Sequence, residues 1–232
     1  MRQGTSLLLF GLCTSLTACV VVIDNDPSWQ SHHHHFSVPA SELAQLNVDI
    51  NSGNLFIEGV DGLDEIHVNA EIKTISDHID AEKYINKQQV EQQLTIQSAG
   101  WDSFDSAWHE PVRINLHIQM PKHLILSATQ GSGNLKISQL NNHVSVDDGS
   151  GNIRLWDIAG HIKIDDTSGN INLKNIIGNV MIDDNSGDIK ADKIQGTLSV
   201  ADTSGDIKVS NTTEFKLLSD TSGQVALNNM GQ

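Results

Sequence analysis

Apolar and polar residues alternate along much of the chain with a period of two. The alternation is clear at Leu46, Val48 and Ile50, and it returns over residues 66–72. Turns that contain Gly, such as NSGN at residues 51–54, separate these runs. This pattern is typical of short β-strands that bury one face.

The dipeptide Ser-Gly recurs every 18 residues in the C-terminal half. Its copies begin at Ser132, Ser150, Ser168, Ser186, Ser204 and Ser222. An unbroken fixed period indicates a solenoid, in which each coil stacks on the preceding one. Gly also recurs at the half-period, as at Gly151 and Gly160, so each coil should contain two strands and two turns.

Apolar positions keep the same 18-residue register and predict four columns of core side chains. The columns begin at Leu135, Ile137, Val144 and Val146, and the fourth ends at Leu218. We therefore predict an all-β fold, a β-solenoid (β-helix) with 18-residue, two-strand coils over residues 121–232. Irregular strands over residues 38–120 complete a single domain, 38–232.

One segment, SDHIDAEKYINKQQ, departs from the strand pattern. It lacks Gly and Pro, Ser76 could cap a helix, and Asp77 and Asp80 would lie in a first turn that favours negative charge. The sequence therefore predicts one short helix over residues 77–88.

The N-terminus predicts export. Residues 1–18 combine one Arg with a short apolar run, which indicates a signal peptide too short to remain as a membrane span. The LTAC stretch at residues 16–19 resembles the bacterial lipobox, which implies a lipoprotein acylated, for example with palmitate, at Cys19. Val20 in place of Asp then implies sorting to the outer membrane. The alternative is a secreted protein cut near Ala18.

Residues 19–37 are predicted to form a lipidated tether. They include His32, His33, His34 and His35. Neutral imidazoles are good ligands for Zn, Ni or Cu, so the run is a candidate metal tract, and a polar linker is the alternative. His143 and His161 lie 18 residues apart and should stack on an outer face, either as a second metal candidate or as two solvated side chains.

The formal charge is -15, and aromatic residues make up 4% of the chain. This acidity argues against nucleic acid as a partner and against docking on anionic lipid through the protein surface. The expected contact with the membrane is the lipid anchor alone.

An acidic column accompanies the Ser-Gly turns, and we expect it to point outward. Its members are Asp148, Asp166, Asp184, Asp202 and Asp220. They could hold the turns through Asx-type hydrogen bonds. Calcium is the alternative, although it requires about six to eight converging oxygen ligands.

The SGN/SGD-I turns, the stretch INLHIQMPKHL and the stretch LNVDINSGNLFIEGVDG carry a family resemblance. Over roughly residues 36–232, the chain resembles bacterial β-solenoid domains known as "putative adhesins", whose function is unknown. The resemblance implies a β-helical fold at the cell envelope and no established activity.

The functional prediction is a non-enzymatic, envelope-anchored module with an adhesin-like binding or structural role and no cofactor. Its candidate partners are a glycan or another envelope protein. Trp101, Phe104 and Trp108 form a candidate binding loop, unless they fold back to cap the solenoid, and Trp156 is a further exposed aromatic candidate. A carbohydrate-active β-helix enzyme and a calcium-binding repeat protein remain the alternatives.

Acylation can be tested by labelling cells with radioactive palmitate. The label should be incorporated into the protein and lost in Cys19→Ser, because the thiol is the acceptor. Incorporation that survives the substitution would contradict the lipobox assignment.

Overall fold

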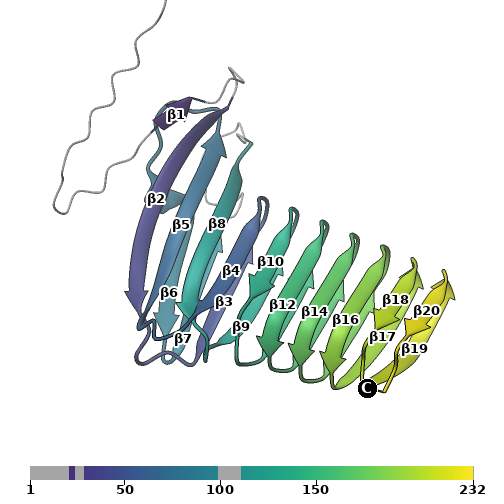
Figure 1. Ribbon diagram of the computed structural model, residues 1–232. Helices are drawn as coiled ribbons and strands as arrows, with labels where there is room; N and C mark the ends of the chain where they lie inside the picture. The colour runs from purple at the N-terminus through teal and green to yellow at the C-terminus, as the bar shows by residue number, and fades with distance from the viewer. Residues whose placement is uncertain (1–20, 24–28, 99–110, 232) are drawn as a thin grey trace, which may run out of the picture.

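The structure is a computed structural model that describes residues 21–23, 29–98 and 111–231. The described strands form two sheets that face each other across one core (Figure 1). In spatial order, sheet A contains β1 (Val21–Ile23), β2 (Gln30–Pro39), β5 (Glu65–Thr74), β8 (Arg113–Pro121), β4 (Leu55–Val60), β10 (Leu135–Ser138), β12 (Ile153–Ala159), β14 (Ile171–Ile177), β16 (Ile189–Gln195), β18 (Ile207–Ser210) and β20 (Val225–Asn228). Sheet B contains β19 (Glu214–Ser222), β17 (Thr197–Ser204), β15 (Val180–Asp184), β13 (Ile162–Asp166), β11 (Val144–Asp148), β9 (Ile125–Gln130), β3 (Gln45–Ile50), β7 (Gln93–Ser98) and β6 (Ile85–Val90).

The predicted solenoid is confirmed. From β9 onward, consecutive strands alternate between the sheets, and each pairs in parallel with the strand one coil later. Leu135 lies beside Ile153, and Ile153 lies beside Ile171, as the 18-residue period requires. In Figure 1 the coils form a regular series from teal to yellow.

One further coil comes from an earlier part of the sequence but stacks directly on the C-terminal array. Strands β3 and β4, with Ser52 and Gly53 between them, pair in parallel with β9 and β10. On their other side they pair in parallel with β7 and β8. Residues 45–60 are therefore a regular coil within the segment that was expected to be irregular.

The helix predicted over residues 77–88 is wrong. The segment contains one short 3-10 turn, η1 (Ala81–Lys83), followed at once by β6. Strand β6 pairs antiparallel with β7 over residues 85–90. These ladder hydrogen bonds, together with burial of Ala81 and Ile85, override the local helix propensity.

The predicted tether is also too long. Residues 30–37 belong to β2, which pairs antiparallel with β5 along its whole length. Apolar partners such as Ile72 and Val68 of β5 are buried and hold this strand on the sheet. Sheet A therefore begins well before residue 38, and its long antiparallel strands close the N-terminal end of the solenoid.

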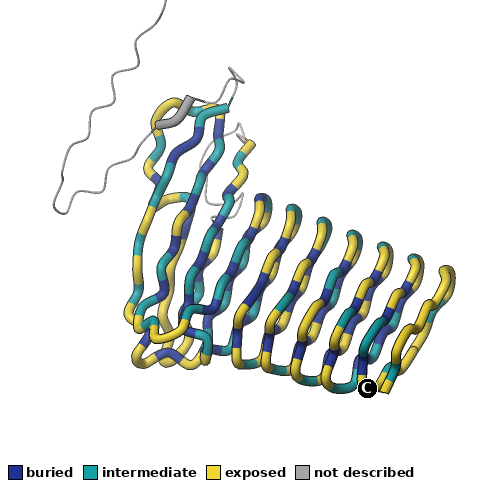
Figure 2. The backbone as a smooth tube through the Cα atoms, viewed as in Figure 1, coloured by how far each residue is buried: buried dark blue, intermediate teal, exposed yellow. Residues whose placement is uncertain are grey.

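The C-terminal end is open, and its last coil is mostly exposed (Figure 2). Register also shifts by one residue there, between Val200 and Ala201. Leu217, and not Leu218, therefore pairs with Val200, which corrects the end of the fourth predicted column.

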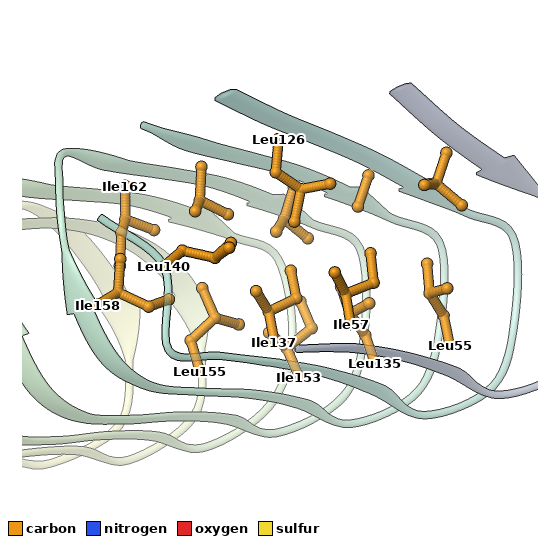
Figure 3. Close-up of a cluster of buried hydrophobic side chains, with 14 of the residues drawn as sticks. Leu55, Ile57, Leu126, Leu135, Ile137, Leu140, Ile153, Leu155, Ile158 and Ile162 are labelled. Atoms are coloured by element: carbon orange, nitrogen blue, oxygen red, sulfur yellow. The ribbon is translucent and has the colours of Figure 1, made fainter. Parts of the chain in front are cut away.

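The core contains a column that the alternation did not predict. Residue 157 and its equivalents at 18-residue intervals have positive φ, which shifts the inward-facing position by one residue. The following residues, Leu140, Ile158, Ile176 and Ile194, are consequently buried. Figure 3 shows Leu140 and Ile158 inside the coil with Leu155 and Ile162.

The Ser-Gly turns are held by close contact between successive backbones. Gly169 has φ +135, and a Cβ built on it would lie 1.6 Å from the carbonyl oxygen of Gly151. Its N–H donates to the carbonyl oxygen of Ser186 at 2.9 Å. Neither the conformation nor the space accommodates a side chain.

Gly169→Ala should therefore lower the free energy of unfolding by about 3 kcal/mol or more, because the neighbouring backbone must move. Gly62→Ala is the control, since Gly62 also has positive φ but nothing lies within 4 Å of its Cβ position. That control should lose about 1 kcal/mol. Chemical denaturation of both variants measures the difference, and equal losses would contradict the backbone-contact explanation.

Candidate functional site

The outer face of sheet A carries a row of aromatic and basic side chains. Parallel pairing aligns His117 of β8, Phe56 of β4, Lys136 of β10 and Arg154 of β12 at neighbouring outward positions. Lys174 of β14 lies beside Trp156 of β12 in the adjacent outward row. We call this surface the basic–aromatic face; it comprises Phe56, His117, Lys136, Arg154, Trp156 and Lys174.

The three rings of this face lie nearly parallel. The ring centroids of Phe56 and His117 are 4.7 Å apart with an interplanar angle of 19°, and those of Phe56 and Trp156 are 6.3 Å apart at 13°. Strands β4 and β12 are separated by β10, so their backbones lie about 10 Å apart. The Phe56 and Trp156 rings must therefore lean toward each other above β10. Ser138, the small residue in β10 beside Trp156, is fully covered.

Two shallow clefts adjoin on this face and share Lys136 and Trp156. The first is lined by Asn54, Leu55, Phe56, Asn115, Leu116, Asn134, Lys136 and Trp156. The second is lined by Lys136, Arg154, Leu155, Trp156, Asp157, Asn172, Lys174 and Asn175. The Arg154 guanidinium lies 5.7 Å from the centroid of the Trp156 ring, a cation–π distance that holds the indole in place.

A ladder of side-chain oxygens runs along the edge of the face and joins successive coils. The Oδ1 atom of Asn152 accepts the backbone N–H of Asn170, and Oδ1 of Asn170 accepts the N–H of Asp188 at 2.9 Å. Asp188 accepts the N–H of Asp206 in the same way at 3.0 Å. Asn and Asp thus fill the same acceptor role in this ladder, and Asn152 also donates through Nδ2 to Oδ1 of Asn134.

The acidic column points inward from Asp148 to Asp202, which corrects the expected outward orientation. Asp148, Asp166, Asp184 and Asp202 are each at most 4% exposed. The Oδ1 atoms of Asp166, Asp184 and Asp202 accept the N–H of the Ser two residues later at 3.0–3.1 Å, so the Asx-type interaction is present. Asp220, in the exposed last coil, makes the same bond to Ser222. The surface positions belong instead to Asp147, Asp165 and Asp183.

The histidine candidates are dispersed by the strand geometry. His32 is buried, with Nε2 3.0 Å from the carbonyl oxygen of Ser76, whereas His33 and His35 stack on the opposite face of β2. His34 packs against Phe36, and burial lowers its pKa.

His143 and His161 stack with ring centroids 5.1 Å apart, as their spacing predicts. Their Nδ1 atoms accept the backbone N–H groups of His161 and Asn179. Within residues 21–23, 29–98 and 111–231, no three His, Cys, Asp or Glu side chains are grouped as a metal site would require.

A sequence profile of the Toastrack DUF4097 family matches residues 27–230, almost all of the chain. The chain belongs to this family. The match includes β2, in agreement with the early start of sheet A. No curated protein is similar in sequence.

Solved structures with a similar path share little sequence with this toastrack domain. A "putative cell adhesion protein" from Clostridium sporogenes covers 86% of this chain and 99% of its own, with 11% identity and a TM-score of 0.45. A "putative lipid binding protein" from Parabacteroides distasonis covers 85% and 96%, with 16% identity and a TM-score of 0.42. A "putative adhesin" from Bacteroides fragilis covers 85% and 96%, with 16% identity and a TM-score of 0.39.

Several candidates from the sequence lie outside the described part of the toastrack domain. Cys19 and the loop residues Trp101, Phe104 and Trp108 fall in segments that the structure does not describe. In the described segments, no helix has the length and apolarity needed to cross a bilayer. Sequence reasoning missed Phe56, His117 and Lys136, although the 18-residue register already placed Lys136 beside Arg154.

Burial changes the acid–base behaviour of the inward Asp column. It raises the pKa of Asp148 and Asp166 to about 6 and that of Asp184 to about 7, and it also raises the pKa of Asp202. Neighbouring carboxylates in the column add to the effect on Asp166 and Asp184. The Oδ2 atoms of Asp166, Asp184 and Asp202 have no hydrogen-bond partner among the described residues. Neutral carboxyl groups therefore suit this interior better than charged ones.

The toastrack domain should therefore lose stability as the pH rises. Folded-state pKa values above the ordinary 3.8 mean that the folded chain binds more protons than the unfolded chain between about pH 4 and pH 7. The stabilisation is complete near pH 4 and is lost as the pH rises through 6 to 7. A shift of two pKa units corresponds to about 3 kcal/mol for one carboxyl group.

Asp184→Asn should raise the melting temperature at pH 8 and flatten the pH dependence, because a neutral amide replaces the buried charge. Asp183→Asn is the matched control, since it removes the same charge from the adjacent exposed position. Thermal unfolding at pH 5 and pH 8 measures both effects. A wild-type protein that is less stable at pH 5 than at pH 8 would contradict the inward-ladder explanation.

Proposed function

We propose that the protein is a non-enzymatic, adhesin-like binding module of the cell envelope and that its basic–aromatic face binds a glycan. The observation that supports this most is the near-parallel arrangement of Phe56, His117 and Trp156 beside two adjoining clefts whose lining includes amide and basic side chains. A pyranose ring has an apolar face of C–H groups and a polar rim of hydroxyls. Aromatic rings match the first, and amide and ammonium groups match the second.

The construction of the face favours a ligand over a purely structural role. Within sheet A, most outward columns carry short or flexible polar side chains, and three rings on one surface are costly to leave partly exposed in water. All three rings are half-buried. Since Ser138 leaves room for the Trp156 ring to lean toward Phe56, the rings form a continuous aromatic strip above the backbone.

The number and location of carboxylates at the clefts favour glycan binding without catalytic turnover. Glycoside hydrolysis usually requires two carboxyl groups on either side of the scissile bond. Among the described residues, Asp157 is the single carboxylate that lines either cleft. The inward Asp column lies inside the coil, where a glycan has no access.

Attachment at Cys19 would orient the module on the membrane. Residues 21–23 already pair with β2, so an acyl chain at Cys19 would hold the antiparallel end of sheet A near the lipid headgroups. The coils would then extend away from the outer membrane. This orientation leaves the outer face of sheet A accessible to glycans.

A glycan array probed with the purified protein tests the proposal. We expect selective binding and a loss of about tenfold or more in affinity for Trp156→Ala and Phe56→Ala, because each removes a stacking ring. Trp29→Ala is the control for loss of an aromatic side chain elsewhere on the domain, where Trp29 contacts Arg113. No reducing sugar should be released from any bound glycan.

Absence of glycan binding, or binding that Trp156→Ala leaves unchanged, would contradict the proposed site. Release of sugar would contradict the non-enzymatic assignment and favour the carbohydrate-active alternative.

A further inference from the structure

The basic–aromatic face groups three cations on a chain of opposite net charge, with Glu58 and Asp192 at the two ends of the outward row that contains Trp156 and Lys174. The whole protein has a formal charge of -15, yet Lys136, Arg154 and Lys174 occupy three successive coils of sheet A. All three side chains are exposed. In the described part of the chain, none of them forms an ion pair. Free cations grouped on an acidic protein indicate an anionic partner.

The oxygen ladder beside the face supports the same partner. Its first members are the uncharged Asn115, Asn54, Asn134, Asn152 and Asn170, whereas the next members are Asp188 and Asp206. Asp188 accepts the N–H of the next coil as Asn170 does, so an acceptor oxygen suffices for that bond, whereas Asn134 and Asn152 also donate through Nδ2 to the Oδ1 of the preceding coil. The ladder changes from Asn to Asp two coils beyond Trp156, where Lys190 and Lys208 continue the basic column of Lys136 and Arg154. The amides keep negative charge away from Lys136 and Arg154.

We propose that the ligand of this face is an acidic polysaccharide whose carboxylates bind Lys136, Arg154 and Lys174 while its rings stack on Phe56 and Trp156. This inference rests on the proposed glycan-binding function and adds the class of glycan. The chain of the ligand runs along the solenoid axis, across the strands, because the rings and the cations are arranged in that direction.

The dimensions of the face suit a repeating anion. The strands β10, β12 and β14 follow one another at about 4.8 Å, so the backbone positions of Lys136 and Lys174 are separated along the axis by about 10 Å. Arg154 lies between them and can bind a carboxylate through two parallel N–H donors. Asp157 is the one carboxylate lining these clefts in the described structure, and the amide of Asn175 donates to it at 2.8 Å.

Calorimetric titration with polygalacturonate and with its fully methyl-esterified form tests the proposal. The two polymers have the same sugar ring, and only the first is charged. We expect the purified protein to bind polygalacturonate at least about tenfold more tightly, with the difference decreasing as salt is added. Arg154→Gln should reduce this preference, whereas Trp156→Ala should weaken binding of both polymers.

Negative charge introduced into the ladder supplies a second kind of variant. Asn152→Asp combined with Asn170→Asp retains both acceptor oxygens and places two negative charges beside the face, with the loss of one hydrogen bond from Nδ2 of Asn152 to Asn134. This double variant should lose about tenfold in affinity for polygalacturonate and little for the methyl ester. Asp188→Asn combined with Asp206→Asn is the matched control, and it should bind polygalacturonate at least as tightly as the unmodified protein. Thermal unfolding establishes that both variants are folded.

The outcomes separate this inference from the proposed function. Equal affinity for the two polymers, both lost in Trp156→Ala, would overturn the acidic preference and leave the glycan site intact. Binding of inorganic polyphosphate as tightly as polygalacturonate, with no effect of Trp156→Ala, would overturn both, because charge alone would then explain it.

Discussion

Close stacking of one backbone turn on the next is the constraint on which this structure depends. At the Ser-Gly turns, the carbonyl oxygen of one Gly occupies the position that a Cβ of the next Gly would need, as between Gly151 and Gly169. No side chain can enter there, so the coils remain in register at 18 residues. All the remaining positions of a coil then lie beside their equivalents in the next coil. The side chains must therefore work as columns: aliphatic inside, carboxyl at the inner edge, and amide or carboxylate at the outer ladder.

The inward Asp column shows the cost of such repetition. One buried carboxyl group that accepts the N–H of its own turn fixes the turn, as Asp184 does for Ser186. Repeating it every 18 residues brings like groups together inside a narrow core, and their charges then oppose folding. Proton uptake relieves the repulsion, so the stability of the solenoid is linked to pH. The neighbouring Asp183 is exposed, so its carboxylate remains in contact with water.

Much of the fold could be predicted from the sequence, because the repeat specifies equivalent positions directly. The column from Leu135 through Ile153 to Ile171 is buried as expected. Strict alternation from Val144 and Val146 also places Asp148 inside, but the general preference of Asp for the surface led to the opposite prediction. The Ile158 column was missed because the positive φ at Asp157 interrupts the alternation. The helix over residues 77–88 failed because pairing of β6 with β7 is a long-range interaction that local propensity does not report.

The same reasoning explains why the candidate site could be only partly predicted. Trp156 was recognisable as an exposed aromatic residue, but Phe56 lies 100 positions earlier and His117 lies between them in sequence. They meet because β4 is inserted between β8 and β10, an order of strands that the sequence does not reveal. The proposed binding site lies where the outward columns depart from their repeat. The outward columns of sheet A do so at Phe56 and Trp156, and the adjoining ladder changes from Asn to Asp two coils beyond Trp156, so irregularities in ring and in charge lie along one face of the solenoid.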